Sequence, residues 1–278
     1  MTDTDSRISR FKGVQEDLET AQRIPPTPQS SAPAYKLAFT DPDFLKREEL
    51  RPVRLQLELL KPEIILSERG VRSTVIMFGG SRVPRPGEAP NAPTQKVRKN
   101  LANVAKYYDE ARLFAQLCSK ESLKHYGHEF VVATGGGPGI MEAGNLGAQE
   151  VGAASIGFNI FLPHEQAPNA YVTPDLCFNF HYFAIRKMHF LMRAKAIAIF
   201  PGGFGTLDEL FEVLTLIQTQ RMDPVPIVLF AEAFWRKIID FEALKDAGTI
   251  SAEDLKLFTF VETADDAWGL IRQHYGLS

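Results

Sequence analysis

The sequence predicts an α/β fold, in which a doubly wound parallel sheet of about seven strands is flanked by helices. From residue 73 onward, short apolar and β-branched runs alternate with longer helical patterns. Runs such as Ala196–Phe200 are continuously apolar, which is typical of strands buried on both faces. Repeated strand–helix alternation implies right-handed crossovers, and these produce a parallel sheet.

Each predicted element follows from its own residue pattern. Short apolar runs between turn residues predict strands at Thr74–Phe78, Phe130–Ala133, Ala154–Phe158, Leu176–Phe180, Ala196–Phe200, Pro226–Phe230 and Phe258–Val261. Apolar residues spaced three and four apart predict helices at Lys96–Lys124, Gly139–Val151, Phe183–Ala194, Thr206–Gln220, Ala231–Ala247 and Ala264–Tyr275. The arrangement is Rossmann-like, and ligands of such sheets bind outside the carboxyl ends of the strands.

The chain before the sheet has a different composition. Residues 1–45 hold five prolines among Ser, Thr and Gln, so we expect a flexible tail or a docking arm. Residues 46–72 form a helical segment within a pattern running from 43 to 69, which Pro52 and Pro62 interrupt. We expect residues 73–278 to form one Rossmann-like domain.

Composition excludes several classes of protein. Lys plus Arg number 31 and Asp plus Glu 34, so we expect neither a nucleic-acid nor a membrane partner. The only cysteines, Cys118 and Cys177, exclude a disulfide framework. No apolar run approaches the roughly 18 residues of a membrane span, and residues 1–10 lack the apolar core of a signal peptide. We therefore expect a cytoplasmic protein.

The loop after Ala196–Phe200 carries the strongest functional signal. It reads Pro-Gly-Gly-Phe-Gly-Thr-Leu-Asp-Glu over residues 201–209 and leads into a helix. Three glycines between a strand and a helix N-terminus let backbone N–H groups approach a phosphate. Alternatively, Thr206 and Glu209 form a capping box, although that does not explain the glycines.

Two further loops resemble this one. After Phe130–Ala133 come Thr134, three consecutive glycines, Pro138 and Gly139, followed by Ile140 to Glu142. A ligand cradle and a tight turn are the two interpretations. After Thr74–Phe78 come Gly79, Gly80, Ser81 and Arg82, which allow close approach and hydrogen bonding to a phosphate, or simply form a turn.

Several familiar sites are absent from the sequence. Neither glycine loop has the G-x-G-x-x-G spacing of a dinucleotide site, and no Gly-Lys pair of a Walker A loop occurs. His125 and His128 lie at a helix end beside Gly127, and no H-E-x-x-H occurs, so we expect no metal site. No G-x-S-x-G nucleophile elbow is present.

Charged residues are predicted at the same edge of the sheet. Arg186 and Lys187 fall early in the helix Phe183–Ala194, where the helix dipole disfavours cations. A bound phosphate would offset this unfavourable interaction. A solvated helix face is the alternative. Asp208, Glu209 and Glu142 lie in first helical turns, where carboxylates are stabilised. A carboxylate there also suits the positive charge that develops on a sugar during N-glycosidic cleavage.

The two glycine loops after the strands Phe130–Ala133 and Ala196–Phe200, with the Arg186–Lys187 pair between them, make the sequence resemble the LOG (Lonely Guy) family. Members of this family are also labelled lysine-decarboxylase-like. The resemblance covers roughly residues 73–275, and the features are P-G-G-x-G-T-x-x-E at residues 201–209, the glycines with Ile140 and Met141, and the Arg186–Lys187 pair. Residues 1–72 and Glu142 depart from the short family form, so the chain resembles a longer form. Lysine decarboxylation is disfavoured, because neither Lys187 nor Lys195 has a context for a pyridoxal phosphate Schiff base.

The resemblance implies a phosphoribohydrolase that splits a nucleoside 5′-monophosphate into free base and ribose 5-phosphate, without a cofactor. It implies catalytic roles for Glu209, at the sugar cation or the attacking water, and for Arg186, which orients the substrate. It also implies a homodimer or a higher homo-oligomer. We expect the other substrate contacts to come from Gly80, Ser81, Gly136, Gly137, Met141, Glu142, Lys187, Gly202, Gly203, Gly205 and Thr206.

Three questions stay open at the level of sequence. The base is adenine, a prenylated adenine (a cytokinin) or another base, and we favour AMP because a general hydrolase needs no special pocket. The acid that protonates the leaving base is unassigned. The main alternative function is a nucleotide or molybdenum-cofactor carrier without turnover. A regulatory protein whose Pro-rich tail recruits a partner is a third possibility.

Overall fold

The computed structural model describes residues 13–162 and 167–277, and the chain divides into two compact units, Met1–Arg54 and Leu55–Ser278. Before α3, the described residues of the first unit form short helices, which are α1 (Val14–Ala21), α2 (Pro42–Leu45) and the 3₁₀ turns Pro33–Tyr35, Ala38–Thr40 and Glu48–Leu50. Asp41 caps α2 by accepting hydrogen bonds from the N–H groups of Asp43 and Phe44 at 3.1 and 3.3 Å. Helix α1 lies within residues 1–45, which we expected to form a flexible tail or a docking arm.

Helix α3 (Arg51–Glu68) spans the boundary between the two units in the sequence. It begins with Pro52 in its first turn, where no N–H partner is needed, and it continues through Pro62. We expected Pro62 to interrupt the helix, and this was wrong. Pro62 and Leu66 are buried, so their packing offsets the loss of the backbone hydrogen bond that Pro62 cannot donate.

The second unit is built on a seven-stranded parallel sheet with the order β4-β3-β2-β1-β5-β6-β7. This confirms the predicted Rossmann-like α/β class. The strands are β1 (Thr74–Phe78), β2 (Val131–Thr134), β3 (Ser155–Ile160), β4 (Cys177–Phe180), β5 (Ala194–Ile199), β6 (Ile227–Phe230) and β7 (Thr259–Val261). The chain builds outward from β1 in one direction and then restarts with β5 on its other side, so the switch point lies between β1 and β5.

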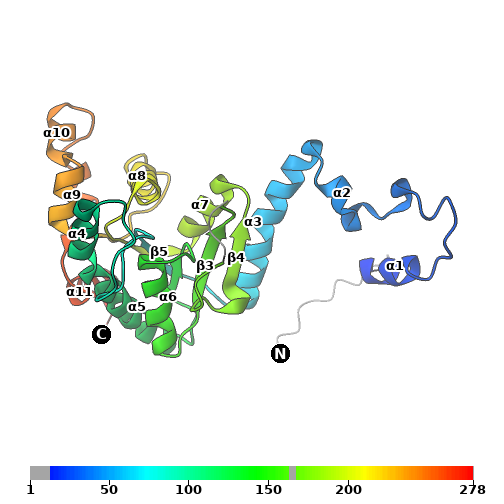
Figure 1. Cartoon of the computed structure of the whole chain (residues 1–278), viewed down its shortest axis with the longest axis horizontal. Helices are drawn as coiled ribbons and strands as arrows, with labels where there is room; N and C mark the ends of the chain where they lie inside the picture. Colours follow the sequence, from blue (N-terminus) through cyan, green and yellow to red (C-terminus); the bar gives the residue numbers. More distant parts are fainter. Residues whose placement is uncertain (1–12, 163–166, 278) are drawn as a thin grey trace. The chain divides into compact units, whose positions relative to one another are not determined.

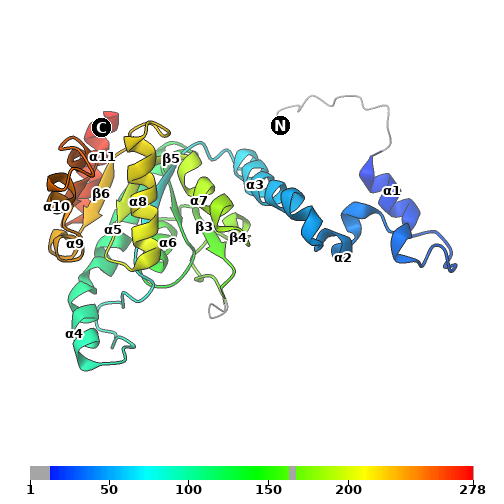
Figure 2. The ribbon, with the colours of Figure 1, turned by 90° about the horizontal axis from the view of Figure 1, so that it is seen from above.

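Helices cover both faces of the sheet, because alternate strand residues point to opposite sides (Figures 1 and 2). Val75 and Met77 of β1 face a cluster with α5 (Lys106–Lys124), α6 (Ile140–Glu150) and α11 (Ala264–Tyr275). Ile76 and Phe78 face a second cluster with α3, α7 (Phe183–Met192) and α8 (Phe204–Gln218). The remaining helices are α4 (Gln95–Val104), α9 (Glu232–Ile238) and α10 (Phe241–Asp246).

Two predicted helices are each divided in two. The predicted helix Lys96–Lys124 breaks at Ala105, because α5 buries apolar residues against the sheet while α4 buries none. The predicted helix Ala231–Ala247 breaks at Ile239, which is extended, and Asp240 then caps α10 by accepting from the Ala243 N–H at 2.9 Å. Over the described ranges, no helix has the length and apolarity needed to cross a membrane.

Candidate active site

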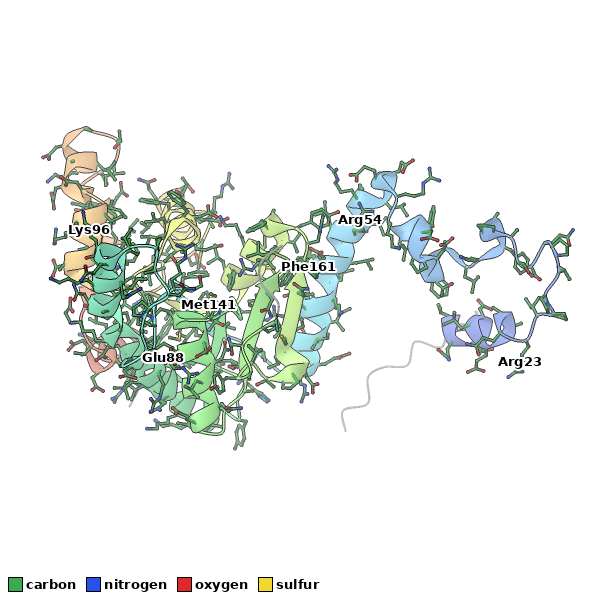
Figure 3. The ribbon with its side chains drawn as sticks, in the orientation of Figure 1. Arg23, Arg54, Glu88, Lys96, Met141 and Phe161 are labelled. Carbon is green, nitrogen blue, oxygen red and sulfur yellow. The ribbon has the colours of Figure 1, made fainter. Side chains whose placement is uncertain are left out.

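A cavity of about 340 Å³ opens at the carboxyl ends of the strands, at the switch point. Its walls come from the loops after β1, β2 and β5, from the end of β3 and from the start of α7 and α8. The lining residues are Phe78, Gly79, Gly80, Ser81, Gly135, Met141, Ile160, Leu162, Phe183, Arg186, Phe190, Gly203, Phe204, Gly205, Thr206, Asp208 and Glu209. Met141, labelled in Figure 3, contributes to this wall from the first turn of α6.

The three predicted loops interlock through their backbones. The Gly80 N–H donates to the Pro201 carbonyl at 2.9 Å, and the Gly80 carbonyl accepts from the Ile140 N–H at 3.3 Å. A Cβ atom at Gly139, which has a φ of +68°, would lie 2.5 Å from that same carbonyl oxygen. Glycine is therefore required where the loops cross, and the crossing holds the N-termini of α6 and α8 at one pocket.

Helix α8 begins two residues earlier than predicted, at Phe204. Its N-cap is Gly203, which has no side chain to accept a hydrogen bond. Thr206 therefore lies within the first turn, and the capping-box interpretation of Thr206 and Glu209 is wrong. The first N–H groups of a helix have no intrahelical partner, so the amides at Gly203–Thr206 are available to an anion in the pocket.

The triple-glycine loop contributes less to the pocket than its sequence suggested. Gly135 lines the cavity, whereas Gly136 and Gly137 are not among the lining residues. Gly136 has a φ of +71°, and a Cβ atom there would lie 2.1 Å from Oδ1 of Asn159. Asn169 holds the loop from outside, with its N–H on the Gly136 carbonyl at 2.8 Å and Nδ2 on the Gly137 carbonyl at 3.0 Å. Gly136 therefore has a packing reason of its own.

Arg186 enters the pocket from the first turn of α7 and lies against Gly135. A Cβ atom at Gly135 would be 2.7 Å from Nη2 of Arg186, so a side chain there would displace the guanidinium. The Nε of Arg186 donates to the Phe158 carbonyl at 2.7 Å, and its Cζ lies 5.1 Å from the ring centroid of Phe190. These contacts fix the side chain and place its positive charge at the cavity wall.

Glu209 is the buried acid of the pocket. Its side chain is 7% exposed, and its Oε2 has no hydrogen-bond partner among the described residues. Burial raises the pKa of Glu209 to about 7, and the nearby charges of Lys187 and Arg186 oppose that rise. A carboxyl group with a pKa near neutrality in a cavity can both hold and release a proton at physiological pH.

Lys187 is not among the residues that line the cavity. Its Nζ pairs with Asp208 at 2.9 Å and with Glu212 at 2.6 Å, and its side chain is 14% exposed. Hydrogen bonds to these two carboxylates raise the pKa of Lys187 against the effect of burial. The solvated-face alternative is therefore wrong for Lys187, which is tied to α8 instead.

Glu142 belongs to a separate cluster. It pairs with Arg85 at 2.6 Å and accepts a hydrogen bond from the Tyr108 hydroxyl at 2.7 Å. The Arg85 guanidinium also lies 5.7 Å from the Tyr108 ring centroid and 5.9 Å from that of Tyr171. Glu142 thus holds the loop 81–94 against α5, outside the cavity. Gly202 is also not among the residues that line the cavity, and a Cβ atom there would lie 2.1 Å from Oγ1 of Thr206.

The structure brings together most of the predicted residues and adds some that were missed. The cavity receives Gly80, Ser81, Met141, Arg186, Gly203, Gly205, Thr206 and Glu209. Two aromatic side chains at the mouth were not predicted, Phe204 (92% exposed) and Phe183 (53% exposed). The sequence signal that could have identified Phe204 is its position between Gly203 and Gly205 in the loop. No three His, Cys, Asp or Glu side chains within residues 13–162 and 167–277 form a metal-binding group.

The fold and the site define an α/β protein with a pocket at the switch point, which a helix N-terminus and a buried carboxyl group line. Residues 141–271 match the family model described as "Possible lysine decarboxylase", which includes the LOG proteins. The predicted resemblance is therefore confirmed over these residues. The match begins at Met141, so the loops after β1 and β2 lie before it. A domain of this family suggests a nucleotide-related function.

Solved structures with a similar fold include three whose own chains are covered almost completely. The protein TM1055 is 19% identical, and its alignment covers 72% of this chain and 99% of the TM1055 chain with a TM-score of 0.47. The molybdenum cofactor binding protein of Rippkaea orientalis is 16% identical, with 73% and 98% covered and a TM-score of 0.46. The molybdenum cofactor carrier protein of Chlamydomonas reinhardtii is 16% identical, with 74% and 99% covered and a TM-score of 0.46. No curated protein matches the sequence.

Proposed function

We propose that the protein hydrolyses the N-glycosidic bond of a nucleoside 5′-monophosphate and releases free base and ribose 5-phosphate. The observation that carries this proposal is Glu209, a buried carboxyl group with a pKa of about 7 and an unpartnered oxygen, in a pocket built of helix N-termini. A site that only bound a phosphate would gain nothing from an acid there, because two negative charges would repel each other.

The 5′-phosphate would bind at the N-terminus of α8. The amides from Gly203 to Thr206 lack a side-chain cap, and the helix dipole adds a partial positive charge. Phe183 and Phe204 lie at the mouth of the cavity with exposed rings, on which a base can stack. A nucleotide held by its phosphate at one end and its base at the other would place its ribose between them.

The chemistry follows from the charge that develops on that ribose. As the bond between C1′ and the base nitrogen breaks, its electron pair leaves with the base and positive charge spreads over the sugar ring. The Glu209 carboxylate stabilises this charge and accepts a proton from the attacking water, whose oxygen bonds to C1′. Arg186 lies at the same cavity and would orient the substrate against Glu209. The leaving base needs a proton, and its donor stays unassigned.

We propose AMP as the substrate, and a cytokinin riboside 5′-monophosphate as the alternative. The cavity of about 340 Å³ is of the size that holds a small nucleotide-like ligand. We further propose a homo-oligomer, as the family resemblance implies. Apolar side chains that stay exposed on α7 and α8 support it, namely Met188, Met192 and Phe211.

A nucleotide panel tests the proposal. The full chain is incubated with AMP, GMP, CMP, UMP and a prenylated AMP, and free base is quantified by chromatography. We expect release of a purine base, abolished by Glu209→Gln, while Glu142→Gln serves as a matched control outside the cavity and retains activity. Binding without base release from every nucleotide would refute the hydrolase and favour a carrier.

A further inference from the structure

Helix α7 begins in a way that its own sequence does not explain. It carries Arg186 and Lys187 early, where the helix dipole disfavours positive charge. The first turn contains no acidic residue, and the side chain of the N-cap residue Tyr182 makes no capping hydrogen bond. The compensation must come from another element.

Helix α3 supplies it through Glu58. Oε1 of Glu58 accepts the His181 N–H at 2.8 Å, and Oε2 accepts the Tyr182 N–H at 3.0 Å. One carboxylate thus satisfies two consecutive amides just before α7 and places a negative charge at its positive end. Charge-assisted hydrogen bonds of this kind are stronger than neutral ones, so they hold the start of the helix firmly.

A second set of contacts holds α7 to α3 further along. The buried His189 ring lies 3.2 Å, through Nε2, from the Glu58 carbonyl oxygen. Arg193, the C-cap residue of α7, pairs with Glu63 of α3, and Nδ1 of His189 lies 3.5 Å from the same carboxylate. Helix α3 therefore contacts α7 at both ends, which fixes its position along its own axis.

Arg186 lies between these two anchor points and has little freedom to adjust. Its Nε is bound to the Phe158 carbonyl, and its guanidinium occupies the space where Gly135 lacks a side chain. A small shift of α7 would therefore move the guanidinium in the cavity or break its hydrogen bond. Misplacement by about 1 Å can cost two orders of magnitude in rate.

We propose that Glu58 is a positioning residue for Arg186, and that α3 is thereby a working part of the active site. Helix α3 lies before residues 141–271, so no part of the family match assigns it this role. The effect on catalysis rests on the proposed hydrolase function, whereas the claim that Glu58 fixes the start of α7 does not depend on it. Glu58 is not among the residues that line the cavity, so it would act through the helix that it caps.

The test compares Glu58→Ala and Glu58→Gln with the matched control Glu68→Ala in the full chain. Glu68 is exposed on the same helix and takes part in none of the ion pairs found among the described residues. We expect Glu58→Ala to lower kcat/KM about tenfold or more, mainly through kcat. Glu58→Gln keeps one acceptor oxygen and should recover part of that loss, while Glu68→Ala should have no effect.

A double-mutant cycle separates positioning from general destabilisation. In the Arg186→Ala background, Glu58→Ala should cause almost no further loss of kcat/KM, because the residue through which it acts is gone. Its effect on thermal stability should be the same in both backgrounds. Equal losses of kcat/KM in the two backgrounds, or recovery of none of the activity by Glu58→Gln, would overturn the proposal.

Hydrogen exchange tests α7 independently of catalysis. In Glu58→Ala, the amides of residues 181–187 should exchange faster, while those of the first turn of α8 should keep their rates. This result can be obtained even if no nucleotide is hydrolysed, so failure of the hydrolase and failure of the positioning role are distinguishable. Unchanged exchange at residues 181–187 would refute the positioning role.

Discussion

Replacing Glu209 by Gln should stabilise the protein at alkaline pH while abolishing base release. Burial raises the pKa of Glu209 from 4.5 to about 7 in the folded chain. A carboxyl group whose pKa is higher in the folded state destabilises the fold wherever it is ionised. The penalty is absent below pH 4.5, grows as the pH rises to 7, and is fully present above it. Gln is neutral and of similar size, so it does not carry this penalty.

The magnitude follows from the two pKa values. Their difference, from 4.5 to about 7, corresponds to about 3 kcal/mol of unfolding free energy at pH 8. Urea denaturation of the ligand-free protein at pH 4.5, 6 and 8 measures it. The difference in unfolding free energy between Glu209→Gln and the wild type should therefore rise by about 3 kcal/mol from the lowest to the highest pH.

Glu68→Gln, which alters an exposed carboxylate, is the control and should show no such rise with pH. A difference between Glu209→Gln and wild type that stays constant from pH 4.5 to pH 8 would refute the reasoning. It would mean that Glu209 ionises in the folded chain as easily as in the unfolded one, and the acid would then not be poised near neutrality.

Three further predictions concern the same pocket. Lys187→Met should move the acidic limb of the kcat/KM profile from near pH 7 to higher pH, because the positive charge of Lys187 lowers the pKa of Glu209; a profile that stays in place or moves to lower pH would contradict this. Gly136→Ala should cost about 2 kcal/mol or more in urea unfolding, because its φ is +71° and the new Cβ atom would clash with Asn159; a loss below 1 kcal/mol would be too small for that clash. Gly203→Ala should leave the melting temperature unchanged, because the new Cβ atom would meet nothing within 4 Å. It should raise KM about tenfold, because the methyl group would narrow the proposed phosphate site. An unchanged KM would mean that the phosphate binds elsewhere.

The arrangement of the site could be predicted because it depends on strand order alone. Parallel strands bring their carboxyl ends to one edge, so the loops after β1, β2 and β5 had to meet there. The same rule explains why Glu209 and Arg186 both line one cavity. Which glycine faces the ligand does not follow from it, because Gly136 is required by Asn159, a residue 23 positions away in β3.

Long-range side-chain contacts account for what the sequence did not indicate. The break at Ala105 depends on which helical residues are covered by the sheet, and a helical pattern does not encode that. Glu142 follows Met141 directly, yet it turns to Arg85 and Tyr108 instead of the cavity. Glu58 lies 123 positions before His181, and no local spacing connects the two.

Oxygen-18 labelling is the most direct test of N-glycosidic hydrolysis by this pocket. AMP is incubated with the full chain in H₂¹⁸O, and the products are analysed by mass spectrometry. We predict unlabelled adenine and ribose 5-phosphate that carries one ¹⁸O at C1, in equal amounts, with neither product formed by Glu209→Gln. Label in inorganic phosphate with adenosine released, or AMP bound and recovered intact, would contradict the proposed reaction.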